Sequence, residues 1–203
     1  MIPNFKAHPW HGISAGEGAP NLVNVFVEIV PSDTIKYEVD KETGYLKVDR
    51  PQQFSNIIPA LYGFIPRTYC DTEVMRLAQE AGSVDVAMGD HDPLDICVLS
   101  SHNIHGGDLL MEAIPIGGFK MIDKGEADDK IVAVMVGDHA FGHFRDISEL
   151  PVAEVQRLKH YFLTYKNLPD EPAKCRIDQV YGAEHAKEVI VASQNDYASR
   201  YGG

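Results

Sequence analysis

The chain has 203 residues, and its 30 acidic side chains outnumber its 18 lysines and arginines, which gives a formal net charge of −12. With 44% hydrophobic and 24% charged residues, the composition is typical of a folded domain rather than a disordered segment. The acidic balance argues against binding to nucleic acid or to an anionic membrane surface, because both partners need basic patches.

Localisation is predicted from what the sequence lacks. No apolar run approaches the roughly 18 residues of a membrane span, and the first residues do not form the apolar stretch of a signal peptide. The cysteines are too few and too scattered for a disulfide framework; they are Cys70, Cys97 and Cys175. We therefore expect a cytoplasmic protein with no membrane partner.

The first 20 residues are rich in Gly, Pro and His and indicate an irregular N-terminal arm. Short segments with β-branched residues then follow, separated by turn signals such as PSD, TGY and GGD. They predict strands over residues 22–29, 35–39, 45–48, 95–99, 109–116 and 131–136. Several short strands joined by such turns favour a small barrel or sandwich.

The last quarter of the chain has a helical period instead. Apolar residues recur every three or four positions after Pro151, which predicts one helix, and a second helix should follow Gly182. Residues 70–89 interrupt the strand pattern and form either a short amphipathic helix or a surface excursion, which we interpret as peripheral. The simplest arrangement is one β-rich domain over residues 1–203 with helices packed outside.

Two motifs resemble functional signatures in the wrong context. The run from Gly12 to Gly16 matches a G-x-S-x-G nucleophile elbow at Ser14, but neither a strand before it nor a helix after it is predicted. His8 and His11 flank a Pro-Trp pair, and we interpret them as part of a surface tail rather than as metal ligands.

The hexapeptide DHDPLD at residues 90–95 concentrates three carboxylates directly before an apolar strand. In an extended chain Asp90 and Asp92 share one face, and Pro93 bends the path so that Asp95 can return toward the same centre. Carboxylates held this close repel one another unless a cation lies between them, and oxygen ligands suit Mg²⁺, Mn²⁺ or Ca²⁺. The alternative is an acidic turn whose side chains accept hydrogen bonds from local backbone amides.

Other charged residues lie where they can join this loop. Two acids and a lysine bracket the polar turn before the last predicted strand, and further charges alternate on earlier strands. Such residues normally form only the solvent-exposed face of a strand, but here the exposed faces of several strands can line one concave site. The residues are Glu28, Lys36, Glu38, Asp123, Asp128 and Lys130.

DHDPLD resembles the Asp-x-Asp-Pro-x-Asp signature of the family I soluble inorganic pyrophosphatases. The resemblance extends over most of the chain, from about residue 28 to residue 169, with further matching segments in the same order. These segments are IVPSDTIKYEVDKETGYLKVDR, LYGFIPRTY, PIGGFKMIDKGEADDKIVAV and HYFLTYKNLP. The resemblance implies a β-rich α+β fold, namely a five-stranded OB-like barrel with flanking C-terminal helices.

The resemblance also implies the Mg²⁺-dependent hydrolysis of pyrophosphate to two phosphates, with several metal ions and Mn²⁺ as a possible substitute. Metal ligation is implied for Asp90, Asp95, Asp123 and Asp128, and for Glu28 through water. Asp92 is implied as the general base, with Tyr62 and Glu38 completing the inner surface of the site. Phosphate binding is implied for Lys36, Arg50, Lys130, Tyr165 and Lys166.

The chain departs from the family pattern in a few places. Lys124 follows Asp123 where many members carry a second acid, and Ile58 and Leu61 stand near positions where members often have aromatic and Asn residues. Residues 70–89 correspond to an insertion relative to short bacterial members. Because those members are commonly hexamers, we expect a homo-oligomer and favour a hexamer.

Three other functions compete with pyrophosphate hydrolysis. They are a metal-dependent phosphohydrolase for nucleotides or polyphosphate, an OB-type nucleic-acid-binding module, and a cation-binding protein without catalysis. The first lacks an evident pocket for a base, the second conflicts with the acidic charge, and the third leaves the matching set of lysines and Arg50 without a purpose. An excess of acids is what a site needs if metal ions are to hold an anionic substrate.

Overall fold

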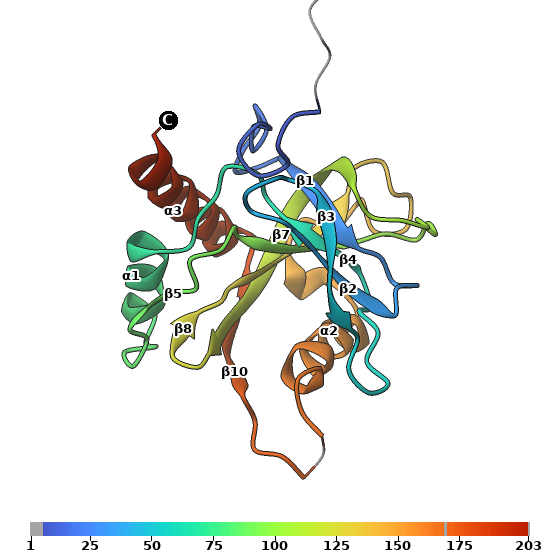
Figure 1. The fold of residues 1–203 in the computed structure, drawn as a ribbon. Helices are drawn as coiled ribbons and strands as arrows, with labels where there is room; N and C mark the ends of the chain where they lie inside the picture. Colours follow the sequence, from blue (N-terminus) through green and yellow to red (C-terminus); the bar gives the residue numbers. More distant parts are fainter. Residues whose placement is uncertain (1–5, 169, 203) are drawn as a thin grey trace, which may run out of the picture.

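The computed structural model describes residues 6–168 and 170–202, and its centre is a closed β-barrel (Figure 1). The barrel strands are β1 (Val23–Ile29), β4 (Leu61–Phe64), β6 (Asp95–Leu99), β7 (Leu109–Asp123) and β9 (Lys130–Met135). They are hydrogen-bonded in the order β1, β4, β6, β9 and β7, and the pairing of β7 with β1 closes the ring. Only β6 and β9 run parallel among these pairs. The predicted five-stranded OB-like barrel is confirmed.

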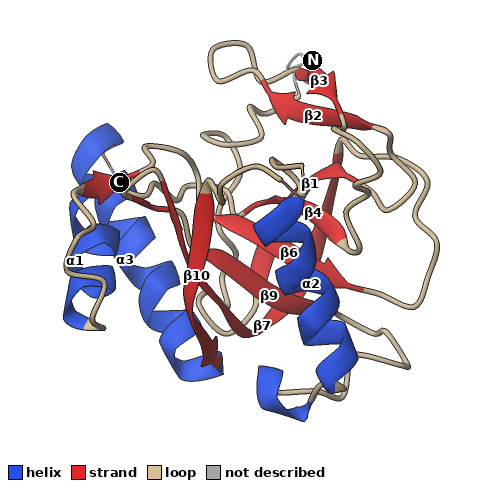
Figure 2. Ribbon diagram, turned by 90° about the horizontal axis from the view of Figure 1, so that it is seen from below, coloured by secondary structure: helices blue, strands red, loops and turns tan. Residues whose placement is uncertain are grey.

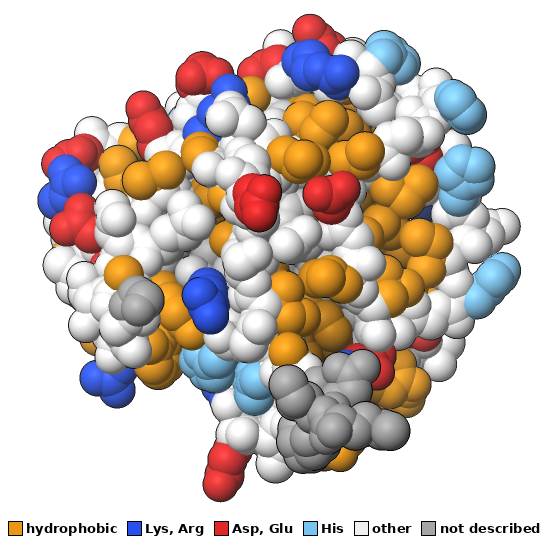
Figure 3. All heavy atoms as spheres, turned by 90° about the horizontal axis from the view of Figure 1, so that it is seen from above, with side chains coloured by type: hydrophobic (Ala, Val, Ile, Leu, Met, Phe, Trp, Pro, Cys, Tyr) orange, Lys and Arg blue, Asp and Glu red, His pale blue; other side chains and the backbone are white. Residues whose placement is uncertain are grey.

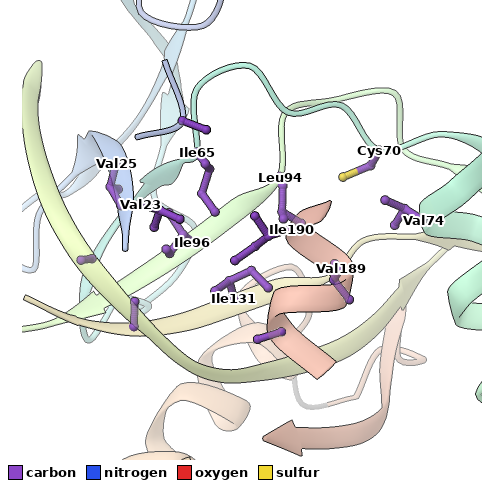
Figure 4. Close-up of a cluster of buried hydrophobic side chains, with 14 of the residues drawn as sticks. Val23, Val25, Ile65, Cys70, Val74, Leu94, Ile96, Ile131, Val189 and Ile190 are labelled. Atoms are coloured by element: carbon purple, nitrogen blue, oxygen red, sulfur yellow. The ribbon is translucent and has the colours of Figure 1, made fainter. Parts of the chain in front are cut away.

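Two apolar clusters stabilise the barrel, and β6 contributes to both. Ile96 and Val98 belong to one cluster and Cys97 and Leu99 to the other, because successive side chains of a strand point to opposite faces. Figure 4 shows the first cluster, where side chains from the strands meet Ile190 of the last helix. These four side chains of β6 are at most 5% exposed, which explains why the strand is continuously apolar after Asp95.

Three α-helices within residues 6–168 and 170–202 pack outside the barrel: α1 (Thr72–Glu80), α2 (Val152–Thr164) and α3 (Ala183–Tyr201). Helices α1 and α3 lie side by side, and α2 lies apart from them over another part of the barrel (Figures 1 and 2). A 3-10 turn, η1 (Ile147–Glu149), precedes α2. Both C-terminal helices begin where the sequence predicts, after Pro151 and after Gly182. No described helix is long and apolar enough to cross a membrane.

A separate hairpin, β2 (Ile35–Val39) and β3 (Leu46–Pro51), lies beside the barrel. Short strands β5 (Met88–Gly89) and β8 (Glu126–Ala127) pair in parallel near the end of β7. The strand β10 (Cys175–Gly182) pairs with the second half of β7 and leads directly into α3.

The predicted strands are corrected at β7, which is longer than predicted, and at β10, which was not predicted. Strand β7 continues to Asp123, because its pairing with β9 has only an irregularity between Pro115 and Gly117 and the two glycines at 117 and 118 stay paired with β9 instead of forming a turn. A Cβ on Gly118 would lie 2.5 Å from the ring of Tyr181, so the close packing of β7 and β10 requires glycine there. Strand β10 was not predicted, because its polar, largely exposed residues carry no apolar alternation.

Residues 70–89 contain a helix rather than an irregular excursion. The carboxylate of Asp196 on α3 accepts hydrogen bonds from the backbone N–H groups of Glu73 and Val74 at 2.9 and 3.1 Å. An acid from one helix therefore satisfies the free N–H groups at the start of the other. The three cysteines are free and buried, in agreement with the absence of a disulfide framework.

The described part of the N-terminal arm is not a surface tail. Trp10 is 3% exposed, and the His11 ring lies 2.7 Å from the hydroxyl of Tyr197 on α3. The interpretation of His8 and His11 as a tail is therefore wrong for this turn. A turn that buries a tryptophan is part of the folded body, because the indole removes a large apolar surface from water.

Candidate active site

The acidic loop, residues 90–95, leads into β6 and is held by the segment before α1. The N–H of His91 donates to the carbonyl of Cys70 at 3.0 Å, and the N–H of Cys70 donates to the carbonyl of Asp92 at 2.9 Å. The Asp90 carboxylate also accepts from the N–H of Asp92 at 3.0 Å. The alternative interpretation was an acidic turn whose side chains accept hydrogen bonds from local backbone amides. It describes only Asp90 among the three carboxylates.

Lys130 at the start of β9 is the centre of the charged cluster. In the parallel pairing of β6 and β9, Asp95 lies opposite Lys130, whose Nζ is 2.5 Å from Asp95 Oδ2 and also contacts Asp128. Burial alone would lower the pKa of Lys130, but the charges of Asp128, Asp95 and Asp90 raise it well above its ordinary value. The lysine is therefore held charged by its acidic neighbours.

The acids of this cluster show the opposite effect of burial. Burial raises the pKa values of Asp90 and Asp128, and for Asp90 repulsion from Asp128 adds to the increase. The Glu28 carboxylate is 7% exposed and accepts from the N–H of Val39 at 2.7 Å. Burial raises the pKa of Glu28 to about 8 despite that hydrogen bond. The cluster thus contains more carboxyl groups than the one lysine pairs with.

The hairpin supplies a second group of charges. Lys36 Nζ lies 2.8 Å from Asp49 Oδ2 and 3.2 Å from Glu38 Oε2, so Lys36 and Glu38 do share one face of β2. Arg50 is paired with Lys36 across the hairpin. The Nη1 atom of Arg50 is buried and has no hydrogen-bond partner among the residues that the structure describes. A buried guanidinium nitrogen of this kind is suited to an anion that the protein alone does not supply.

The end of α2 brings a third group to the site. Lys166 Nζ lies 2.5 Å from Asp123 Oδ2, which joins the end of this helix to the end of β7. The other Asp123 oxygen, Oδ1, is buried and accepts no hydrogen bond from the described residues. Burial raises the pKa of Tyr165, while the nearby charges of Lys130 and Lys166 act against that increase. The Nζ atom of Lys166 lies 5.1 Å from the centre of the Tyr165 ring.

A cleft of about 100 Å³ lies between the hairpin and the acidic loop. Six of the predicted site residues line it: Glu28, Lys36, Glu38, Tyr62, Asp92 and Asp95. The other seven do not line it, namely Arg50, Asp90, Asp123, Asp128, Lys130, Tyr165 and Lys166. Lys130 and Asp128 adjoin the cleft through Asp95, whereas Lys166 and Asp123 pair with each other.

The cleft contains residues that the sequence analysis missed. Lys41, from the turn of the hairpin, contacts the carboxylate of Asp92, and Trp10 forms part of the wall. Asp49 pairs with Lys36 across the hairpin. The alternation of charges along β3 could have indicated Asp49. The N-terminal arm has no periodicity, so nothing in the sequence pattern indicated Trp10.

The acids of the site suit a hard divalent cation. All are oxygen donors, and Asp123 Oδ1 lacks a partner among the described residues. Burial raises the pKa values of Asp90 and Asp128, and a bound cation would stabilise their ionised forms. Within the same residues no three His, Cys, Asp or Glu side chains form a ready-made metal cluster. The ammonium of Lys130 lies against two of the acids, so the arrangement includes an internal cation.

The surface shows no sign of a nucleic-acid groove on the face in Figure 3. Lysine and arginine side chains are scattered there among acidic, apolar and uncharged ones rather than gathered in a basic patch. A surface of this kind lacks the continuous positive potential that a nucleic acid needs.

Comparisons with known proteins agree with the fold. The family model described as inorganic pyrophosphatase matches residues 25–198. The chain is 45% identical to the "Inorganic pyrophosphatase" of Chlamydia caviae over 96% of this chain and 92% of that one. It is 38% identical to "Soluble inorganic pyrophosphatase 1" of Arabidopsis thaliana, over 96% of this chain and 82% of that one.

The structural comparison gives the same result. The crystal structure of inorganic pyrophosphatase from Thermus thermophilus matches with a TM-score of 0.77 and 28% identity, over 94% of this chain and 99% of that one. Fold, sequence and family model therefore agree over nearly the whole chain. The chain belongs to the inorganic pyrophosphatase family and is an enzyme of that family.

Proposed function

We propose that this enzyme hydrolyses pyrophosphate to two phosphates in the cleft beside the acidic loop, with Mg²⁺ as its cofactor. The observation that carries the proposal is the convergence of acids with lysines and Arg50 from the hairpin, the acidic loop, the β7–β9 turn and the end of α2. Phosphoryl transfer needs this combination, because charge on the phosphate oxygens must be neutralised while a nucleophile is held in line.

Metal ions would be held by four aspartates, with Glu28 acting through water; the four are Asp90, Asp95, Asp123 and Asp128. Several Mg²⁺ ions would bind, because each takes only one or two carboxylates, and Mn²⁺ is a possible substitute. When bound, the metal ions neutralise phosphate charge and lower the pKa of a bound water. The carboxyl groups beyond the two that Lys130 pairs with support this assignment.

The phosphate groups would be gripped by five side chains: Lys36, Arg50, Lys130, Tyr165 and Lys166. Arg50 can offer two parallel N–H donors, and its Nη1 has no partner among the described residues. The lysines now contact aspartates, so each would exchange a carboxylate oxygen for a phosphate oxygen as metal and substrate enter. The pairs with aspartate keep the lysines in place before the substrate binds.

Asp92 would act as the general base that accepts a proton from the attacking water. It lines the cleft, and its carboxylate contacts the ammonium group of Lys41; a carboxylate at this place is suited to accept a proton from a water in the cleft. Tyr62 and Glu38 would complete the inner surface. Burial of the hydroxyl and the nearby charge of Asp95 raise the pKa of Tyr62 well above its ordinary value, so this hydroxyl stays protonated and can donate a hydrogen bond.

The decisive measurement is phosphate release from pyrophosphate with and without Mg²⁺. We expect Asp92→Asn to lower kcat at least 100-fold, as loss of a general base does, and Asp95→Asn to abolish measurable release. Circular dichroism should show both variants folded. Near-normal turnover in both variants would contradict the site assignment, and a matched exchange at the remote, exposed Asp85→Asn serves as the control.

Two further measurements separate this function from its competitors. Turnover of ATP should be much slower than that of pyrophosphate, and equal rates would favour a general phosphohydrolase instead. A gel shift with single-stranded nucleic acid at low salt should be negative. We also propose a homo-oligomer, with a hexamer favoured, and a light-scattering mass near that of one chain would exclude it.

A further inference from the structure

The turn His8–His11 of the N-terminal arm is built into the wall of the cleft. The Trp10 indole Nε1–H donates to the carbonyl of Thr68 at 2.8 Å, and the N–H of Arg67 donates to the carbonyl of Trp10 at 2.9 Å. Trp10 lines the cleft together with Lys41 and Asp92. The arm is thus hydrogen-bonded to the segment that runs beside the acidic loop.

Thr68 connects this arm to the acidic loop. Its side chain is fully buried, and its hydroxyl donates to the carbonyl of Ile65 at 2.6 Å while it accepts from the N–H of Leu94 at 2.9 Å. Leu94 precedes Asp95, the acid that contacts Lys130. Two hydrogen bonds, with Thr68 between them, therefore lead from the Trp10 indole to the residue next to Asp95.

A second set of contacts connects the arm to the middle of the acidic loop. His91 stands between Asp90 and Asp92 with a φ of 61°, a left-handed conformation that is uncommon outside glycine. The hydroxyl of Tyr69 lies 3.0 Å from Nδ1 of His91, and the rings of Trp10 and Tyr69 pack 6.3 Å apart. The strained residue of the loop is therefore fixed by a side chain that itself packs on the arm.

The arm also touches the hairpin on the other side of the cleft. A Cβ added to Gly44 would lie 2.9 Å from the His8 ring and 2.9 Å from Pro9. That turn carries Lys41, which contacts Asp92. The turn His8–His11 therefore contacts both walls of the cleft, the hairpin turn and the segment behind the acidic loop.

We infer that Trp10 and Thr68 are positioning residues of this active site, which set the place of the acidic loop and so of Asp92 and Asp95. The inference rests on the proposed function and concerns how its site is held. Neither residue need touch the substrate. Their effect is geometric, because a displacement of about 1 Å at a reacting group can lower a rate about 100-fold.

Thr68→Val tests the inference, because valine has the shape of threonine but leaves the buried N–H of Leu94 without an acceptor. We expect kcat to fall at least tenfold, with KM for pyrophosphate changed less, and the Mg²⁺ concentration for half-maximal activity to rise several-fold. Thr68→Ser keeps the hydroxyl, and its kcat should stay within about twofold of that of the wild type.

Ser193→Ala is the control, since the equally buried hydroxyl of Ser193 bonds only to its own helix. A folded Thr68→Val enzyme with unchanged kcat and Mg²⁺ dependence would overturn the inference.

Trp10 provides a readout that does not need activity, because it is the only tryptophan of the chain. Titration of the wild type with Mg²⁺ alone should change the Trp10 emission in a saturable way. In Thr68→Val, the midpoint of this titration should move to a higher Mg²⁺ concentration. If Thr68→Val does not fold, the double variant Trp10→Phe/Tyr69→Trp should show the same shift. Ser193→Ala should leave the midpoint unchanged. Midpoints that coincide in all variants would overturn the inference. A wild type that releases no phosphate would overturn the proposed function instead, and the emission titration would still decide whether arm and loop are linked.

Discussion

Two buried lysines of the same barrel, Lys130 on β9 and Lys120 on β7, are at most 2% exposed, yet they differ in electrostatic state. Lys120 Nζ bonds to the neutral side chain of Gln179 at 3.1 Å, and burial lowers the pKa of Lys120 despite the more distant charges of Asp129 and Asp178. Lys130 contacts two aspartates and its pKa is raised. Burial is common to both, so the surplus of carboxylates around Lys130 distinguishes the site from the rest of the barrel.

The largest effect is expected at Lys130. Lys130→Met leaves Asp95 and Asp128 buried without their cation, and breaking a buried pair in this way costs about 3–5 kcal/mol. We expect a clear fall in the melting temperature without metal, loss of phosphate release, and a greater stabilisation by Mg²⁺ than in the wild type. Differential scanning calorimetry with EDTA and with Mg²⁺ measures this. A metal-free variant as stable as the wild type would show that the acids do not repel one another.

A smaller, pH-dependent effect is expected at Glu28, where burial raises the pKa to about 8. An unfolded glutamate ionises near pH 4. Between these values the unfolded chain binds fewer protons than the folded one, so the free energy of unfolding falls as pH rises from about 4 to about 8. Glu28→Gln keeps the acceptor for Val39 and should flatten this dependence in thermal melts in EDTA. A variant whose melting profile has the same slope as the wild type would refute the assignment.

The smallest effect is expected at Lys120. Lys120→Met removes a buried charge beside a neutral amide, and Gln179 can bond to water instead because it is exposed. Replacement of a buried charge by an apolar side chain of similar size is often neutral or stabilising. Phosphate release should remain within about twofold of the wild type, and the melting temperature should stay the same or rise. Loss of activity here would break the distinction between the two lysines.

The sequence predicts those parts of the fold that have a simple pattern. The β-branched runs of β6 and β9 and the helical period after Pro151 gave nearly correct bounds, whereas β10 has no alternation because most of its side chains are exposed. Strand β4 was missed for a different reason. Gly63 interrupts its short apolar run, yet a Cβ there would lie 1.8 Å from the carbonyl of Phe26. The glycine that hides the strand is what allows its close packing on β1.

The charged residues of the site were predictable as types, but their pairing was not. That Lys130 contacts Asp95 follows from the register of two strands 35 positions apart in the chain, which no local pattern encodes. The contribution of Trp10 depends on a turn without periodicity that folds back over the cleft. Local patterns thus predict elements and residue chemistry, while long-range pairing decides which charges meet.

The parallel pairing of β6 and β9 has a consequence for how such a site can change over time. In an antiparallel pair the loops that precede the two strands would leave at opposite ends of the barrel. Because these two strands run the same way, the loops before them both open at one end, and each can accept substitutions or insertions without disturbing the apolar strands behind it. The barrel thereby separates the part of the chain that must stay constant to fold from the part that is free to vary its chemistry.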